Sequence, residues 1–214
     1  MDRLGLDEAY RFARGEQVDA THSGPVRLSR PLDFLVVADH SDNMGFFPRL
    51  YAGDPEMLAD PTGKKWYEMV QAGGQEGVKA AVEIIIAFSQ GTFPEKLESL
   101  PGSPAYRSAW EETIAAAEKY NEPGRFTALI GYEYTTRGGF NLHRNVLFRG
   151  DAAAANKTVP FSQFDSQNPE DLWRELEKFE NNSGEDVLAI PHNGNLSNGR
   201  MFADKNNAGK ALTK

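Results

Sequence analysis

The apolar run Leu32–Ala38 (LDFLVVA) constrains the fold of this chain more than any other segment. Nearly all of its residues are apolar and of types that favour β-structure, which is typical of a strand covered on both faces in a parallel sheet. The run ends in the polar sequence Asp39-His40-Ser41-Asp42. Functional groups of α/β proteins and barrels gather beyond the carboxyl ends of such strands. The segment therefore predicts a parallel α/β sheet or barrel with polar groups at one edge.

Two more apolar runs end in the same way. Phe126–Ile130 leads into Glu133, and Val187–Ile190 leads into His192. After Glu133 comes a polar stretch with two adjacent glycines, which allows the chain to turn back on itself. His143 then heads a neighbouring strand-like run, His143–Phe148. A carboxylate at the end of one strand and an imidazole at the start of the next can converge on one ion.

Three of the four histidines therefore lie at predicted strand ends, with a carboxylate among them. Imidazole nitrogen and carboxylate oxygen are ligands that suit zinc, manganese or iron. We expect His40, Glu133, His143 and His192 to share a site for a divalent metal. For each residue alone, the competing interpretation is a hydrogen-bonded structural role or an ion pair with an arginine. The fourth histidine, His22, lies in a polar loop and is expected to face solvent.

The polar neighbours of these residues fit supporting roles. Asp39 could bond the far nitrogen of a ligand imidazole, which fixes its tautomer and raises its basicity. Asn145 and Asn193 could orient ligands or touch substrate oxygens. Arg144 could bind an anionic substrate group through its planar guanidinium. A salt bridge to Glu133 or a surface role is the alternative for this arginine.

A long helical segment, residues 43–122, separates the first two strands. Its clearest predicted helices are Thr62–Ala72, Gln75–Ser89 and Ser103–Tyr120, the last with Ser103 as N-cap and Pro104 in the first turn. This segment has about eighty residues, which is far longer than a connection through a single crossover helix requires. We expect an inserted helical layer, or a lid over the site. One side of the predicted helix Gln75–Ser89 carries the apolar residues Val78, Val82, Ile85 and Ile86.

The remaining segments are shorter. Asp7–Gly15 predicts an amphipathic helix, and Asn168 caps a predicted helix over Pro169–Asn181 that buries Leu172, Trp173, Leu176 and Phe179. Asp151–Ser166 is expected to be an irregular loop. Residues 203–214 are expected to form a loosely anchored tail, and the whole chain to form a single domain.

Composition excludes several classes of protein. The net charge is −8, from 31 acidic and 23 basic side chains without a basic cluster, which disfavours a nucleic-acid partner. The absence of cysteine excludes disulfide scaffolds and thiolate zinc sites. No apolar run approaches the roughly 20 residues that cross a bilayer, and no signal-peptide pattern begins the chain. A membrane partner is not expected, and the localisation stays open. Because a helix begins almost at once, we expect the chain to be a fragment.

The motif order resembles that of the PHP (polymerase and histidinol phosphatase) superfamily, through Asp39-His40, Glu133 with His143, and Pro191-His192. More narrowly, the segments DEAYRFARGE, RPLDFLVVADHSD, PGRFTALIGYEYT, NLHRNVLFR, PEDLW and VLAIPHNGNLSNG resemble an uncharacterised, domain-of-unknown-function branch of it. The resemblance covers the chain from about Leu6 to Phe202.

This resemblance implies a distorted (β/α) barrel with metal ions at the strand carboxyl ends. It also implies that His40, Glu133, His143 and His192 are ligands, with Glu133 bridging ions and Glu133 and Arg144 serving catalysis. The implied activity is a phosphoesterase-type hydrolysis of a small anionic substrate by metal-activated water. Hydrolysis of an amide or lactone, and a non-catalytic metal- or ligand-binding module, are the alternatives.

Two motifs of that superfamily are missing. No His-x-His pair lies on a first strand, and no Asp-x-His follows His192. The resemblance therefore implies an incomplete barrel over residues 1–214. Unpaired strand edges invite association, so a homo-oligomer is expected.

Overall fold

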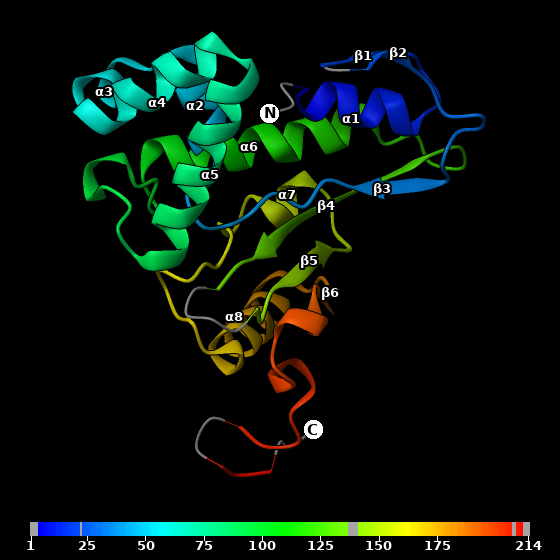
Figure 1. Ribbon diagram of the computed structural model, residues 1–214. Coiled ribbons are helices and arrows are strands. Elements are labelled where there is room, and N and C mark those ends of the chain that lie inside the picture. Colours follow the sequence, from blue (N-terminus) through cyan, green and yellow to red (C-terminus); the bar gives the residue numbers. More distant parts are fainter. Residues whose placement is uncertain (1–3, 22, 137–140, 207–208, 212–214) are drawn as a thin grey trace.

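The computed structural model describes residues 4–21, 23–136, 141–206 and 209–211, and these form a mixed α/β fold with two sheets (Figure 1). The main sheet has the strand order β3-β4-β5-β6. A separate antiparallel pair, β1 and β2, lies near the N-terminus. The strands are β1 (Val18–Ala20), β2 (Gly24–Val26), β3 (Phe34–Val36), β4 (Thr127–Tyr134), β5 (Arg144–Phe148) and β6 (Val187–Pro191).

The directions of the strands correct the expected barrel. β3 and β4 are parallel, whereas β4 pairs with β5, and β5 with β6, in antiparallel fashion. Strands β3, β4 and β6 thus run one way and β5 runs the other way. Among the described residues the main sheet stays open and closes into no barrel. The expected α/β class is confirmed, whereas the expected incomplete (β/α) barrel is not, because β5 runs antiparallel to both of its neighbours in the sheet.

The two faces of the main sheet differ. Successive side chains of a strand point to opposite faces, and one face of β4 and β5 is buried, with Ile130, Tyr132, Val146 and Phe148 in the core. The opposite face carries Glu133 and exposes Leu188 of β6. The buried face packs against α6 (Pro104–Tyr120) and α8 (Pro169–Ser183), through ring contacts such as Trp110 to Tyr132 and Phe179 to Phe148.

The apolar run Leu32–Ala38, which contains β3, is covered on one face only. Leu35 and Val37 pack against the core, whereas Phe34 is 64% exposed. Within the described part of the chain, β3 lies at the edge of the sheet and has one strand neighbour, β4. The prediction of a strand buried on both faces was therefore wrong, although the strand itself is present.

Four of the five α-helices between β3 and β4 surround a second core. This core contains Phe46, Trp66, Ile84 and Phe93, apart from the core beneath the sheet. The predicted N-cap Ser103 of α6 is confirmed, since its hydroxyl accepts from the N–H of Tyr106. The other four helices are α2 (Phe46–Ala52), α3 (Pro55–Ala59), α4 (Pro61–Ala72) and α5 (Gly74–Gln90), followed by the short 3-10 helix η1 (Glu95–Leu97).

Helix α5 turns its aliphatic stripe outward. The side that packs inward carries small residues and one isoleucine, namely Gly77, Ala80, Ile84 and Ala87. The opposite side is exposed to solvent and carries the four aliphatic residues that the sequence placed on one side of this helix, Val78, Val82, Ile85 and Ile86. Most of this exposed stripe is β-branched aliphatic surface on a helix, which is unusual for a purely structural element.

The remaining helices complete the fold. α1 (Leu6–Ala13) packs beside α6, and the helix capped by Asn168 ends at Gly184 as predicted. Residues 152–155 form the short helix α7 with Asp151 as N-cap, so the expected irregular loop is helical here. Trp173 is 41% exposed and not buried as predicted. The 3-10 helices η2 (Gly194–Leu196) and η3 (Arg200–Phe202) follow β6. In the described parts of the chain, no helix has both the length and the apolar character that a membrane crossing requires.

Candidate metal centre

The strand directions bring the predicted ligands to one edge of the main sheet. His40 follows β3, Glu133 is near the carboxyl end of β4, and His192 follows β6. Because β5 runs the opposite way, its beginning lies at that same edge, with His143 just before it. A parallel bridge joins His40 to Glu133, and the N–H of His192 donates to the carbonyl of His143 at 2.9 Å. Backbone pairing alone therefore gathers all four residues.

Glu133 is the centre of this cluster. Its Oε1 lies 2.8 Å from Nδ1 of His143, and its Oε2 lies 3.4 Å from Nδ1 of His40. His192 is farther away, with Nε2 3.7 Å from Oε1. Glu133 is buried, while His40 is largely exposed and His143 is partly exposed. His40, Glu133 and His143 together form a candidate metal site.

The distances agree with ligands around one ion. Metal–ligand bonds of about 2.0–2.2 Å separate neighbouring ligand atoms by about 2.8–3.6 Å at octahedral or tetrahedral angles. The 2.8 Å between Glu133 Oε1 and His143 Nδ1 lies at the short end of that interval, and the His192 separation of 3.7 Å lies just beyond it. One ligand atom from each of His40, Glu133 and His143 lies within 4.8 Å of the others. The donor set, two imidazoles and a carboxylate, is one that zinc, manganese and iron accept. The residues present therefore fit a divalent ion.

Two threonines hold the imidazole rings. Nε2 of His143 lies 3.2 Å from the carbonyl oxygen of Thr136, which can accept a hydrogen bond from that nitrogen and leave the Nδ1 lone pair for an ion. The Thr135 hydroxyl donates to the carbonyl of Glu133 at 3.3 Å and can accept from Nδ1 of His40 at 2.8 Å, which leaves Nε2 of His40 for an ion. Without an ion, the same contacts form a hydrogen-bonded network in which Glu133 offsets imidazolium charge.

The charges of the cluster act on the Glu133 carboxylate. Burial by itself raises the pKa of Glu133, but the hydrogen bond from His143 and the charges of the three histidines outweigh it, so the pKa lies below its ordinary value. The carboxylate is thus in its charged form at neutral pH, which is the form that binds a cation.

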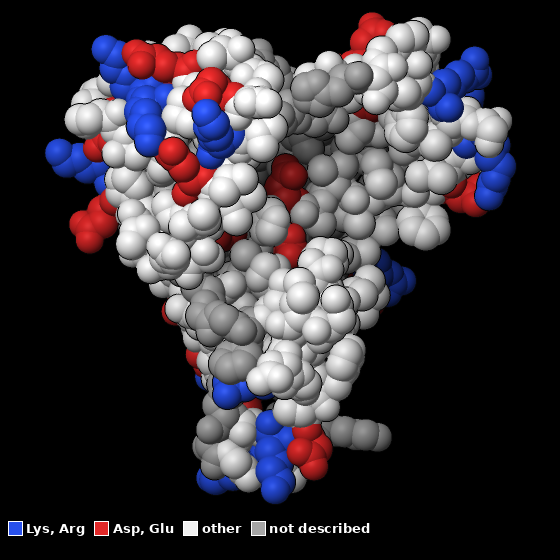
Figure 2. Space-filling view, viewed as in Figure 1, with Lys and Arg blue, Asp and Glu red and all other residues white. Residues whose placement is uncertain are grey.

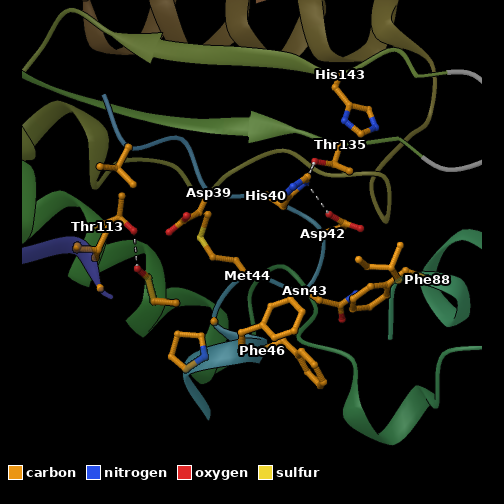
Figure 3. Close-up of a pocket in the computed structure, with 18 of the residues that line it drawn as sticks. Asp39, His40, Asp42, Asn43, Met44, Phe46, Phe88, Thr113, Thr135 and His143 are labelled. Carbon is orange, nitrogen blue, oxygen red and sulfur yellow. Dashed lines mark hydrogen bonds and ion pairs between the residues drawn. The ribbon is translucent and has the colours of Figure 1, made fainter. Parts of the chain in front are cut away.

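The neighbouring aspartates differ from expectation. The ring of His40 lies 3.8 Å from the Asp42 carboxylate, which also accepts from the side chain of Gln163 at 3.0 Å. Figure 3 shows the Asp39 carboxylate pointing away from the His40 ring. Asp39 still reaches solvent, but burial of its surroundings raises the pKa of this carboxyl, with the charge of His40 opposing in part. Asp42 is thus the carboxylate that lies nearer to the His40 ring, and the supporting role of Asp39 stays a prediction.

The predicted asparagines lie beside the cluster. Asn145 pairs with Glu133 across β4 and β5, which places both side chains on the same face of the sheet. Nδ2 of Asn193 lies 3.2 Å from Nε2 of His192. Asn141, just before β5, accepts from the backbone N–H of His143 at 3.4 Å.

Arg144 is not brought to the cluster. It pairs with Tyr134 across the ladder, one step away from Glu133, so its side chain lies on the opposite, buried face. There its guanidinium donates to the carbonyl of Leu142 at 2.6 Å and lies 5.8 Å from the Trp173 ring centroid. Burial lowers the pKa of Arg144. In this position its contacts are structural, and the predicted interaction with an anionic substrate remains untested.

A cleft of about 1090 Å³ opens beside the cluster. His40, His143, Thr135 and Thr136 line one part of it, and the other walls include residues of α1, α2, α5 and α6 and of the segment that leads from β3 to α2. Figure 2 shows the molecule hollowed between its two upper lobes, with acidic side chains at the bottom of the hollow. The volume is at the upper end of the range for small-molecule sites. The cluster is thus open to a substrate.

Sequence reasoning missed Thr135, Thr136 and Asp42 as partners of the histidines. Asp42 had a detectable signal, since it lies two residues after His40 at the same strand end. The threonines continue β4 beyond Glu133, but their contacts depend on how the chain turns into β5. His22 lies outside the described residues, as does Arg137, one of the two arginines near Glu133 in the sequence that the ion-pair interpretation concerns.

Comparison with known proteins identifies the family. The family model described as "Protein of unknown function (DUF3604)" matches residues 1–214. No curated protein and no solved structure gives a significant match. The suspected resemblance to the PHP superfamily is corrected by these findings, because the match is to DUF3604 and the described sheet is open. The chain therefore belongs to the DUF3604 family.

Proposed function

We propose that this chain is a divalent-metal-dependent hydrolase that cleaves an ester bond, with a phosphoester as the first candidate. The observation that supports it best is the convergence of His40 and His143, which line a cleft of about 1090 Å³, on the buried carboxylate of Glu133. A structural ion would be enclosed by protein, whereas a catalytic ion keeps a position open to water or substrate. His40 is largely exposed within this arrangement.

The reaction balances without a further reactant. An oxygen of water forms a bond to the phosphorus or carbonyl carbon, the ester bond breaks, and a proton from the water goes to the leaving alcohol. A divalent ion held by these residues would lower the pKa of a bound water molecule and polarise the phosphoryl or carbonyl oxygen of the substrate. The chain itself supplies the ligand set and the threonine contacts that orient both imidazoles.

The cleft also limits the charge of the substrate. Among its described lining residues there is no lysine or arginine, while Asp39, Asp42 and Glu112 are acidic. A doubly charged phosphate monoester would meet these carboxylates with only the ion to offset them. A singly charged phosphodiester fits the cleft better. The same feature favours a second candidate, a neutral carboxylic ester or lactone.

The test combines metal binding with a small substrate panel. Purified protein is loaded with manganese or zinc, its metal content is measured, and hydrolysis of bis-p-nitrophenyl phosphate, p-nitrophenyl phosphate and p-nitrophenyl butyrate is followed. His143→Ala should lose both metal and hydrolysis, and the control Glu111→Gln, on the exposed surface of α6, should retain both.

The outcomes separate the alternatives. Metal binding that depends on His143 without hydrolysis of any substrate would reduce the site to a metal-binding module. Faster hydrolysis of the diester than of the monoester supports the phosphodiester, and faster hydrolysis of the butyrate supports the carboxylic ester. Absence of bound metal, with identical behaviour of His143→Ala and the native chain, would refute the proposal.

A further inference from the structure

The cleft has an apolar arm that the proposed chemistry does not use. Beyond the histidines, its walls are formed by Leu6 and Ala9 of α1, Phe47 and Tyr51 of α2, and Ile85 and Phe88 of α5. These side chains come from three helices that are distant in sequence (Figures 1 and 3). An ester-cleaving centre needs only a few polar groups, so this arm requires a separate explanation.

The aromatic part of this arm is preformed. The buried ring of Phe46 contacts the ring of Phe47 at a centroid distance of 5.3 Å and the ring of Phe88 at 6.0 Å. Phe88 also stacks on Phe93 at 4.2 Å. Because the second core holds these rings from behind, they present a fixed apolar surface to the cleft. A preformed surface of this kind binds a ligand without a large ordering cost.

Ile85 contributes solvent-exposed apolar surface to the cleft. It is 61% exposed and lines the cleft, and it continues the exposed stripe of α5 formed by Val78 and Val82. Exposed apolar surface beside a cluster of polar groups in a cleft is a feature of ligand sites. Its neighbour Ile86 is 45% exposed but does not line the cleft.

The charge of the cleft lining favours uncharged apolar ligands over anionic ones. The described lining contains three carboxylates and no lysine or arginine, and its two histidines lie at the metal centre. A ligand with a second anionic group, such as a nucleotide or a sugar phosphate, would meet like charge away from the metal centre. An uncharged hydrocarbon or aryl group meets no such repulsion. The occupant is therefore an amphiphile whose polar, reacting end faces His40 and His143.

We infer that the cleft binds the uncharged alkyl or aryl arm of an ester substrate between α1, α2 and α5, next to the metal centre. For the identity of the reacting bond this inference rests on the proposed function. The binding of the apolar arm itself needs neither metal nor hydrolysis, so it can be measured separately.

The experiment uses the metal-free chain and a fluorescent apolar probe. N-phenyl-1-naphthylamine is bound and then displaced by butanol, hexanol, octanol and decanol. Affinity should rise by about two- to fourfold for each added methylene until the arm is filled. Octyl sulfate should bind at least threefold more weakly than octanol, because the carboxylates repel it. Affinity that is independent of chain length, or tightest for octyl sulfate, would overturn the inference.

Two adjacent substitutions on α5 provide the matched control. Ile85→Glu should weaken probe binding at least tenfold, whereas Ile86→Glu should stay within twofold of the native chain. Ile85→Ser, with an expected loss of about threefold, replaces the first variant if circular dichroism shows that the glutamate unfolds α5. Equal effects at positions 85 and 86 would contradict the inference.

The same measurements separate this inference from the proposed function. Chain-length-dependent binding without any hydrolysis leaves the apolar arm in place and rejects the hydrolase. Hydrolysis of the ester panel without chain-length-dependent binding supports the hydrolase and rejects the apolar arm.

Discussion

Oε1 of Glu133 and Nδ1 of His143 lie 2.8 Å apart, although ten residues separate them in the chain. The antiparallel pairing of β4 with β5 is what joins them, because it returns the chain to the edge where β4 ends. Every other predicted ligand is placed relative to this pair. His40 reaches the other oxygen of Glu133, and His192 reaches the same oxygen as His143 from a longer distance.

The charge of Glu133 is expected to dominate metal affinity. Glu133→Gln keeps the size of the side chain but removes the negative charge at the centre of three imidazoles. We expect zinc or manganese affinity, measured by isothermal titration calorimetry, to fall by more than the 10- to 100-fold typical of losing an outer partner of a ligand. The exposed Glu111→Gln serves as the control, and equal affinities of the two variants would argue against a site centred on Glu133.

Thr135 is expected to act as a positioning residue. Thr135→Val removes the hydroxyl 2.8 Å from His40 Nδ1 while keeping the shape of the side chain. Metal affinity should fall by about tenfold with an unchanged melting profile of the metal-free protein, because solvent can replace the partner of an exposed ring. Thr113→Val is the matched control, since the Thr113 hydroxyl donates within its own helix to Ala109 at 3.0 Å. An effect of the control as large as that of Thr135→Val would contradict a positioning role.

Gly131 is expected to tolerate no side chain. A Cβ at this position would lie 2.6 Å from the carbonyl oxygen of Val146 and 2.6 Å from Cγ2 of Val36. Gly131→Ala must therefore push β4 away from a neighbouring strand, at a cost of about 1–3 kcal/mol of unfolding free energy or more. Urea denaturation measures this loss, and metal affinity should fall with it because the ligands sit on the same strands.

Gly77→Ala gives the control for that substitution. A Cβ at Gly77 would lie 4.0 Å from the carbonyl oxygen of Met69, an ordinary van der Waals distance, and alanine favours the interior of a helix such as α5. The variant should be up to about 1 kcal/mol more stable than the native chain. A loss of stability at Gly77 similar to that at Gly131 would show that the close approach to β3 and β5 is not the cause.

The ion pair of Asp54 with Arg49 is expected to make stability depend on pH. The hydrogen bond from Arg49 to Asp54, 2.7 Å long, lowers the pKa of this carboxyl, and burial opposes only in part. A carboxyl with a lowered folded-state pKa stabilises the fold above its unfolded pKa of about 3.9, and this contribution is lost as the pH falls through the lower folded pKa.

Asp54→Asn isolates that contribution. Asparagine keeps an oxygen that can accept from the N–H of Glu56, which Asp54 does at 2.9 Å, but it lacks the charge. At pH 7 the variant should be less stable by about 0.2–1 kcal/mol. In urea denaturation the difference between the two proteins should shrink as the pH falls below about 4. A difference that is constant over this range would exclude the ion pair as its source.

The helices of this chain were largely predictable from local signals. Ser103 before Pro104, and Asn168 before Pro169 with Gly184 at the end, mark boundaries through hydrogen bonds that form within a few residues. The candidate metal ligands could also be predicted from the sequence, because polar groups directly follow apolar strand segments. The prediction of a homo-oligomer and that of a small anionic substrate stay predictions.

The sequence by itself thus determined the positions of the principal helices and strands, the ligand types of the candidate site and the short separation of Glu133 from His143. Only the tertiary structure decided that Arg144 faces the buried side, and that Phe34 and Ile85 are exposed. The physical reason is that an apolar pattern shows which side chains share a face, whereas the partner of that face is chosen by long-range pairing and packing. The cleft beside His40 and His143 exists because of those long-range choices.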